Sequence, residues 1–266
     1  MSIPLLVAFS GGRTSAYMSH LINSKQVCTE YEPHFVFCNT GLEHEDTLRF
    51  VNEVDKKLLD NKVVWLEAVV NPEKGKGIRH KFVTYETASR KGEPYEAVMQ
   101  KYQVPGMTTP ICTDRLKTTV ITSYLRETFK TTKITRALGI RADETRRAKE
   151  KALVIYPLVD LDIDKQDVLE FCAQFEWDLR IPEHLGNCVT CFKKSDRKLV
   201  QAYNDAPEYF HILNDMILRK GEESHPFRKY RSVIDIINLA KEVGDTSNLP
   251  NLDGGCSESC EFMETM

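Results

Sequence analysis

The stretch that decides the fold is IPLLVAFSGGRTS, residues 3–15. Its first seven residues form a continuous apolar run, which is typical of a strand buried on both faces of a sheet. Ser10, Gly11 and Gly12 interrupt the run, and residues 14–22 have the pattern of a helix. The order strand, glycine turn, helix predicts the opening unit of an α/β protein with a parallel sheet.

The same alternation continues along the first two-thirds of the chain. Residues 71–110 are rich in Lys, Gly and Pro and are expected to be irregular. Alternating strands and helices predict a doubly wound, mostly parallel, Rossmann-like sheet with helices on both faces. Further strands are predicted at residues 34–38, 63–68, 134–138 and 153–158, and helices at residues 45–59, 113–129 and 164–175.

After about residue 180 the pattern changes to helices alone. Segments 195–204, 207–219 and 230–243 have helical patterns, and no strand-like run separates them. We therefore predict an α/β domain over residues 1–180 and a helical C-terminal extension over residues 181–266, which carries a C-x-x-C and a cysteine-bearing tail.

Composition narrows the class of protein. The 266-residue chain is 41% hydrophobic and 28% charged with a net charge of −3, a balance typical of folded proteins and not of basic nucleic-acid binders. No apolar run reaches the roughly 18 residues of a membrane-spanning helix, and residues 1–9 lack the features of a signal peptide. We expect a cytoplasmic protein without membrane contact, whose eight cysteines serve metal or redox chemistry rather than disulfides.

The junction at residues 10–15, here named the glycine loop, has the chemistry of a phosphate site. A helix that begins directly after two glycines points backbone N–H groups at one spot, and its dipole adds positive potential there. Glycines let a phosphate approach the backbone, and Ser10, Thr14 and Ser15 add hydroxyl donors. We expect phosphates to bind here, and a valine in place of Gly11 to exclude them.

This loop resembles the pyrophosphate-binding loop of the PP-loop ATP pyrophosphatases, and more specifically that of the phosphoadenylyl-sulfate (PAPS) reductase-like family. Four other segments resemble motifs of that family: FCNTGLE at residues 37–43, ICTDRLK at residues 111–117, GIRADE at residues 139–144 and YPL at residues 156–158. The resemblance covers residues 3–200 and implies a site for ATP or another adenine nucleotide. The nucleotide-binding residues that it implies are Ser10, Gly11, Gly12, Arg13, Thr14, Ser15, Asn39, Thr40, Gly41, Lys117, Gly139, Arg141, Asp143 and Arg147.

The chain departs from the family pattern at Arg13 and Thr14, where many members have Lys-Asp. That departure leaves the identity of the nucleotide open. Asp143 and Glu144 lie beside the expected phosphates, where they could contact Mg²⁺ or pair with neighbouring arginines.

Cysteine spacing is the second strong signal. Cys188 and Cys191 form a C-x-x-C whose thiolates can share one metal or cluster. The iron–sulfur branch of the family has a Cys-Cys pair at the equivalent of residues 112–113 and a C-x-x-C about as far downstream, and here Thr113 replaces the second cysteine. Cys112, Cys188 and Cys191, with Cys256 or Cys260 as the fourth ligand, are thus candidates for a 4Fe–4S cluster. A zinc site on the C-x-x-C and the two tail cysteines, or free redox thiols, are the alternatives.

Three functions remain open on the sequence. The first is an ATP-dependent sulfur-transfer enzyme, in which a nucleic acid or a small molecule is adenylated and sulfur from a donor then displaces AMP. The second is a reductase of adenylyl sulfate or PAPS that releases sulfite with a thioredoxin-like reductant; Cys260 precedes Glu261 rather than the glycine of the family's tail motif, which counts against it. The third is a nucleotide-binding module without catalysis. We favour the first and expect Cys112, Arg141 and Cys260 to be catalytic.

Overall fold

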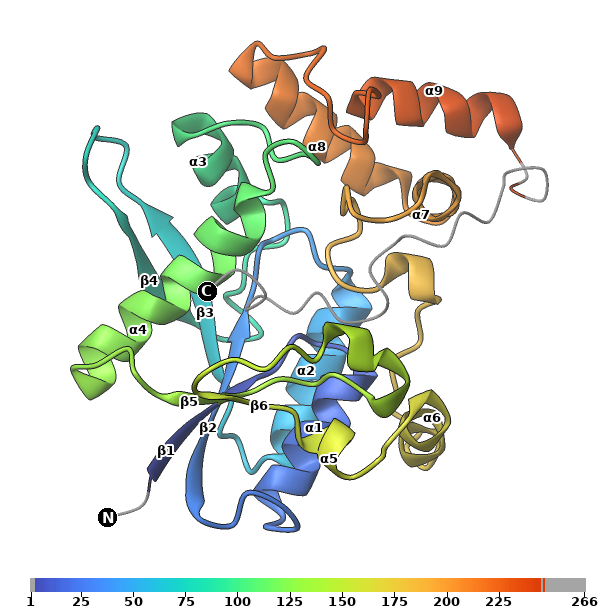
Figure 1. Cartoon of the computed structure of the whole chain (residues 1–266). Helices are drawn as coiled ribbons and strands as arrows, with labels where there is room; N and C mark the ends of the chain where they lie inside the picture. The colour runs from blue at the N-terminus through green and yellow to red at the C-terminus, as the bar shows by residue number, and fades with distance from the viewer. Residues whose placement is uncertain (1–2, 245, 247–266) are drawn as a thin grey trace.

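A six-stranded sheet forms the centre of the structure, with the strand order β4-β3-β2-β1-β5-β6 (Figure 1). The computed structural model describes residues 3–244 and 246. Neighbouring strands are parallel except β3 and β4, which are antiparallel, so the predicted mostly parallel sheet is confirmed. The strands are β1 (Ile3–Ala8), β2 (Tyr31–Cys38), β3 (Val64–Val70), β4 (Ile78–Val83), β5 (Thr135–Ala137) and β6 (Val154–Ile155).

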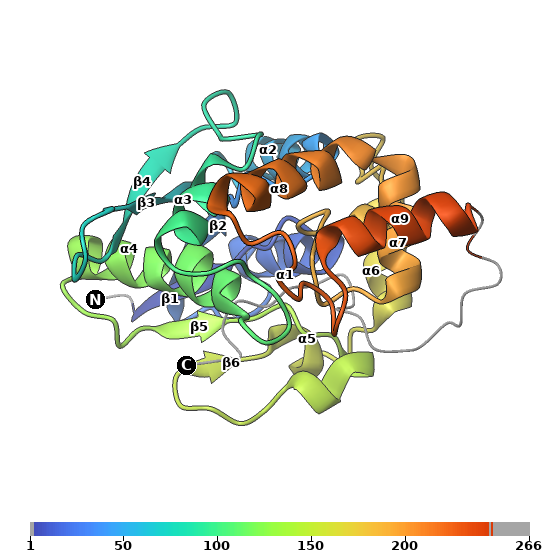
Figure 2. The ribbon, with the colours of Figure 1, turned by 90° about the horizontal axis from the view of Figure 1, so that it is seen from above.

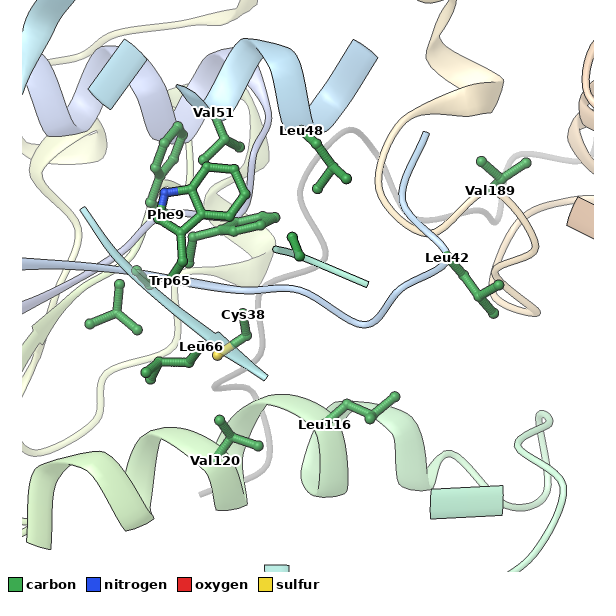
Figure 3. Close-up of a cluster of buried hydrophobic side chains, with 14 of the residues drawn as sticks. Phe9, Cys38, Leu42, Leu48, Val51, Trp65, Leu66, Leu116, Val120 and Val189 are labelled. Carbon is green, nitrogen blue, oxygen red and sulfur yellow. The ribbon is translucent and has the colours of Figure 1, made fainter. Parts of the chain in front are cut away.

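Helices cover both faces of this sheet. The helices α1 (Arg13–Asn23), α2 (Glu45–Leu58) and α6 (Lys165–Ala173) lie on one face, and α3 (Glu93–Lys101) and α4 (Thr119–Phe129) lie on the other (Figure 1). Figure 3 shows Leu48 and Val51 of α2 on one side of the strands and Val120 of α4 on the other. The central strand β1 is buried on both faces because helices cover each of them, as its apolar run predicts.

The segment at residues 71–110 is more regular than its composition suggests. It contains β4, which pairs with β3 as an edge strand, and α3, which begins after Gly92 with Pro94 in its first turn. Charged side chains on β4 hide the strand because an edge strand has one solvated face. The expected strand at residues 153–158 is shorter than predicted, since Pro157 begins the short helix α5 (Pro157–Asp160).

The predicted helix at residues 113–129 begins with a turn of another kind. Residues Thr113–Thr118 form a π-helix, η1, which continues directly into α4. π-helical turns are rare and are often found at functional sites. This turn carries Lys117, and Cys112 immediately precedes it.

The C-terminal part is helical, as predicted. The helices α7 (Asp196–Asp205), α8 (Pro207–Lys220) and α9 (Val233–Val243) pack together on one side of the molecule (Figure 2). The Ser195 and Ser232 side chains cap α7 and α9 by accepting hydrogen bonds from backbone N–H groups of the first turns. Among the described residues, no helix has the length and apolar character needed to cross a bilayer. The proposed division at residue 180 stays a prediction.

Candidate functional site

The order of the strands reverses at β1, and the glycine loop lies at that point. β1 pairs with β2 on one side and with β5 on the other, so the connections after β1 and β5 leave the sheet in opposite directions. In open parallel sheets, ligands bind at the carboxyl ends of the strands at such a reversal. The sheet topology therefore brings residues 10–15 and residues 138–141 to one place.

Two contacts show how closely these segments approach. A Cβ atom added at Gly139 would lie 3.2 Å from the Cα of Ser15. The Arg141 Nη1 donates to the Thr14 Oγ1 at 3.3 Å. The Gly-Ile-Arg segment after β5 thus packs directly against the glycine loop, in agreement with the shared site that the sequence predicts.

Hydroxyl groups hold the glycine loop in shape. The Ser10 N–H donates to the Ser15 Oγ at 3.1 Å, and the Ser15 Oγ in turn donates to the Gly12 carbonyl at 3.0 Å. Gly12 is the N-cap of α1, and among the described residues no side chain caps this helix. The N-terminus of α1 therefore offers its N–H groups and the positive end of its dipole to a ligand.

Arg13 is held by a carboxylate on the chain segment that leads to the C-x-x-C. Its Nε donates to both carboxylate oxygens of Asp178, at 2.9 and 3.0 Å, and its Nη2 donates to the Leu179 carbonyl. Arg49 of α2 donates to the carbonyls of Trp177 and Asp178, each at 2.8 Å. We name residues 177–187 the linker. Two arginines thus fasten its start to the glycine loop and to α2.

The basic residues after β5 are paired with the two acids beside them. The Arg141 side chain is 4% exposed, and its Nε and Nη2 donate to the carboxylate of Asp143 at 2.9 and 3.0 Å. The Arg147 Nη1 donates to Glu144 at 2.9 Å. The hydrogen bonds from Arg141 lower the pKa of Asp143. Of the two alternatives for these acids, pairing with arginines is the one present in the structure.

The loop after β2 carries three of the predicted nucleotide-binding residues. The Asn39 Nδ2 donates to the buried carboxylate of Glu67 at 2.6 Å, and the Gly41 N–H donates to the Asn39 Oδ1 at 3.1 Å. The Thr40 N–H and Oγ1 donate to the carboxylate of Glu43, at 2.9 and 2.8 Å. Burial raises the pKa of Glu43, and the charge of Lys117 opposes the rise. Asn39 and Gly41 therefore shape this loop, and of the three only Thr40 lines a pocket described below.

Cys112, Cys188 and Cys191 meet in one pocket, which we name the thiol pocket. They come from the residue before η1 and from the C-x-x-C, segments that are far apart in the sequence. The pocket contains about 440 Å³ not filled by protein atoms. Its walls are Thr40, Tyr95, Cys112, Thr113, Lys117, Asn187, Cys188, Thr190, Cys191 and Phe192.

The C-x-x-C is fastened to the loop after β2 and to a buried lysine. The Val189 N–H donates to the Leu42 carbonyl at 3.0 Å, and these two side chains lie close together in Figure 3. The Lys194 side chain is nearly buried, and its Nζ donates to the carbonyls of His184, Cys188 and Val189 at 2.6, 3.1 and 2.9 Å. The thiols of the C-x-x-C are thereby held at the mouth of β2.

Burial and neighbouring charges affect the ionisable groups of the thiol pocket. Burial raises the pKa of the Cys188 thiol, Glu43 and Cys191 add to the rise, and Lys194 opposes it. Burial also raises the pKa of Tyr95 well above its usual range, and all three thiols contribute. The thiols are therefore mostly protonated at neutral pH unless a ligand or a conformational change brings a positive charge to them.

The described residues do not form the predicted metal site. No three His, Cys, Asp or Glu side chains among residues 3–244 and 246 are arranged so that they could hold a metal ion. Cys256 and Cys260, the candidate fourth ligands, lie outside the described residues, as does the catalytic role predicted for Cys260. The iron–sulfur, zinc and magnesium sites remain predictions, and no chemical step below depends on them.

A second hollow, which we name the loop hollow, lies between the glycine loop and the linker. It contains about 350 Å³ not filled by protein atoms, part of it open to solvent. Asn187 lines both this hollow and the thiol pocket, so the two spaces adjoin. The residues that line the loop hollow are Gly11, Gly12, Arg13, Thr47, Leu179, Ile181, Pro182, Glu183, Gly186 and Asn187.

A glycine loop at the reversal of a mostly parallel sheet defines a PP-loop type of nucleotide-binding α/β protein. The chain belongs to the phosphoadenosine phosphosulfate reductase domain family, whose model matches residues 4–178. It is 36% identical over 277 residues to the uncharacterized nin region protein ORF290 of Escherichia phage lambda, covering 97% of this chain and 94% of that protein. No solved structure matches the chain significantly. Membership of this family points to an enzyme that uses an adenine nucleotide.

Sequence reasoning missed several residues that the structure places at the site. Tyr95 lies in the segment expected to be irregular, yet it is buried beside the three thiols. Lys194 and Thr47 have no pattern that sets them apart from surface and helix-core residues. Glu43 and Asn187 stand inside or next to recognisable motifs, and that proximity was the available signal.

Proposed function

We propose that the protein is an ATP-dependent sulfur-transfer enzyme. The nucleotide binds at the glycine loop, and the thiols of the thiol pocket carry the sulfur. The observation that carries this proposal is the contact between the two spaces, since Asn187 belongs to the walls of both. An acceptor held between them would reach the phosphates on one side and a thiol on the other.

The first step is adenylation of the acceptor. An oxygen atom of the acceptor attacks the α-phosphate of ATP, the bond to the β-phosphate breaks, and pyrophosphate leaves. Backbone N–H groups at the start of α1 stabilise the charge that develops on the phosphoryl oxygens. Arg141 lies against Thr14 of the same loop and contributes its positive charge. The product is an acceptor whose carbon–oxygen bond is activated by AMP as the leaving group.

The second step transfers sulfur from a cysteine. One of the three pocket cysteines carries a persulfide, received from a sulfane-sulfur donor, and its terminal sulfur attacks the activated carbon as AMP leaves. A second pocket thiolate then attacks the cysteine sulfur of the new disulfide and releases the thiolated acceptor. The enzyme is left with a cysteine disulfide, which a thioredoxin-like dithiol reduces with two electrons and two protons.

The description of the family supports a second candidate, a reductase of a nucleotide sulfate. In that reaction a pocket thiolate attacks the sulfur of the sulfate, and the nucleotide phosphate leaves. A dithiol then reduces the cysteine S-sulfonate and releases sulfite. Both candidates use the same loop and the same thiols, so the products distinguish them.

The test loads the purified protein with ³⁵S-sulfane sulfur and adds α-labelled ATP and a deproteinised cell extract as the source of acceptors. We expect AMP, pyrophosphate and ³⁵S-labelled acceptor, all absent with an α,β-methylene ATP analogue. Cys112→Ala, Cys188→Ala and Cys191→Ala should lose most of the ³⁵S transfer and keep ATP binding. Cys172→Ala is the matched control, because Cys172 is buried in α6 and does not line the pocket.

Three results would contradict the proposal. Sulfite released from adenylyl sulfate or PAPS with thioredoxin, without AMP from ATP, would select the reductase. Nucleotide binding with neither product would indicate a module without catalysis. Transfer that survives all three single cysteine substitutions would place the sulfur elsewhere.

A further inference from the structure

The hydroxyl of Thr47 is buried without a partner at the wall of the loop hollow. Thr47 lies in the first turn of α2 and is 1% exposed. Its Oγ1 makes no hydrogen bond to any part of the chain that the structure describes. Leaving a buried hydroxyl unpaired is costly, and such groups in native proteins commonly mark the place of an absent ligand or water.

The position of this hydroxyl relates it to the glycine loop. A Cβ atom added at Gly11 would lie 3.0 Å from the Thr47 Cγ2, so the two residues are in van der Waals contact distance across the loop. Thr47 lines the loop hollow together with Gly11, Gly12 and Arg13 at the start of α1. One space thus receives the N-terminus of an eleven-residue helix and an unpartnered buried hydroxyl.

The charges around the loop hollow are compatible with an anion. Arg13 is paired with Asp178, and Glu183 on the opposite wall is paired with Lys198. Asp46, the residue before Thr47, accepts hydrogen bonds from the Arg49 Nε and the Arg180 N–H, both at 2.6 Å. Each carboxylate near the space is therefore compensated, and the helix N-terminus supplies the remaining positive potential.

We propose that Thr47 is a phosphate-binding residue, whose hydroxyl donates to an oxygen of the pyrophosphate part of the nucleotide held in the loop hollow. This inference rests on the proposed use of ATP and adds to it a ligand from α2, outside the glycine loop. The linker forms the opposite wall of the same space. The bound group is a pyrophosphate rather than a sulfate, because the hollow extends away from the loop toward Pro182 and Glu183.

Titration calorimetry with inorganic pyrophosphate, and separately with ATP, tests the role of the hydroxyl. Thr47→Val keeps the shape and removes the donor, whereas Thr47→Ser keeps the donor and removes the methyl group. We expect Thr47→Val to weaken pyrophosphate binding about tenfold or more, the usual effect of losing a hydrogen bond to a charged group. Thr47→Ser should stay within about threefold of the wild type.

The matched control is Ser19→Ala. Ser19 lies in α1, is fully buried, and its Oγ also has no partner among the described residues, but it does not line the loop hollow. We expect its substitution to leave pyrophosphate affinity unchanged. The melting temperature of ligand-free Thr47→Val should equal or exceed that of the wild type, because the unpaired hydroxyl is gone.

Several outcomes would overturn the inference. They are equal pyrophosphate affinity of Thr47→Val and wild type, equal loss in Thr47→Ser and Thr47→Val, and failure of the wild type to bind pyrophosphate. A lower melting temperature of ligand-free Thr47→Val would mean that the hydroxyl stabilises the chain itself, which also contradicts it. Sulfur transfer is judged separately, by AMP and ³⁵S products, so each idea can fail without the other.

Discussion

Gly139 shows how one absent side chain sets the distance between two loops. Its α-carbon faces the backbone of Ser15, and a methyl group there would lie 3.2 Å from the Cα and 3.4 Å from the N of that residue. Backbone atoms cannot move aside as a flexible side chain can. The contact between the Gly-Ile-Arg segment and the glycine loop therefore requires glycine at this position.

Gly139→Ala is expected to push these two segments apart by a few tenths of an ångström. Because Arg141 follows two residues later, we expect ATP affinity to fall about tenfold, with a loss of about 1 kcal/mol in the free energy of unfolding. Calorimetry and urea unfolding measure the two effects. Gly77→Ala is the control, since nothing lies within 4 Å of a Cβ at that position; equal ATP affinity of both variants would contradict the interpretation.

Gly11 behaves differently from the sequence-based expectation. Its φ is +87°, and a Cβ there would point toward Phe37, Thr47 and Val51 in the core, not into the expected phosphate site. A valine at this position would thus strain the backbone and overpack the contact with α2. The expected loss of nucleotide binding would then follow from a distorted loop, and not from a side chain that occupies the site.

At the scale of elements, the C-x-x-C turn depends on Lys194 more than on its own sequence. Three carbonyls of residues 184–189 converge on one nearly buried ammonium group. Removal of the ammonium group leaves these acceptors without their donor, and each buried unpaired group costs about 1–3 kcal/mol. The orientation of the thiols is therefore a property of this lysine as well as of the cysteines.

Lys194→Met is expected to loosen this turn while the sheet stays intact. We expect a loss of about 3 kcal/mol in the free energy of unfolding. Hydrogen exchange of residues 184–194 should become faster, and that of β1 and β2 should not. Lys241→Met, on the exposed side of α9, is the control; unchanged exchange in residues 184–194 would show that the lysine does not hold the turn.

The first turn of α2 is fastened to the linker by Asp46. Burial raises the pKa of Asp46, but the hydrogen bonds from Arg49 and the Arg180 N–H, with the charge of Arg49, outweigh it and lower the pKa. A carboxylate whose pKa is lowered on folding stabilises the folded state above its usual pKa, about 4. That stabilisation disappears as the pH falls through the lowered value.

Asp46→Asn is therefore expected to cost about 1–2 kcal/mol at pH 7. The difference from the wild type should narrow as the pH falls below 4, and urea unfolding at pH 7, 4 and 3 measures it. Asp60→Asn, at an exposed position, is the control. A difference between Asp46→Asn and wild type that does not change with pH would contradict the role of the charge.

At the scale of the whole molecule, the linker joins the two parts of the site. It begins at the contacts with Arg13 and Arg49, forms the far wall of the loop hollow, and ends at the C-x-x-C. A ligand in the loop hollow touches both the glycine loop and the linker. Nucleotide binding and the position of the thiols are thus expected to be coupled.

Hydrogen exchange with and without ATP tests this coupling. We expect ATP to protect residues 10–15, 139–144 and 177–191, and to leave α8 and α9 unchanged. Asp178→Asn breaks the pair with Arg13 and should reduce the protection of residues 177–191 while that of residues 10–15 remains. Protection confined to residues 10–15 in the wild type would show that the linker does not respond to the nucleotide.

The sequence by itself determined the features that depend on neighbouring residues. The apolar run before Ser10 specifies a buried strand, the glycine pair specifies the turn into α1, and the C-x-x-C specifies two adjacent thiols. These patterns also identified the family, which the match over residues 4–178 confirms. The strand β4 and the helix α3 escaped because an edge strand and a short helix bury only part of their surface and leave a weak periodicity.

Only the tertiary structure decided which distant residues meet. The parallel order β2-β1-β5 brings residues 10–15 against Gly139, and the packing of the C-x-x-C on the loop after β2 brings Cys188 and Cys191 to Cys112. It also gave Arg13 the partner Asp178, and it left the Thr47 hydroxyl unpaired at the loop hollow. Periodicity records the environment of each segment, but contacts between segments far apart in the chain depend on the order and direction of the strands.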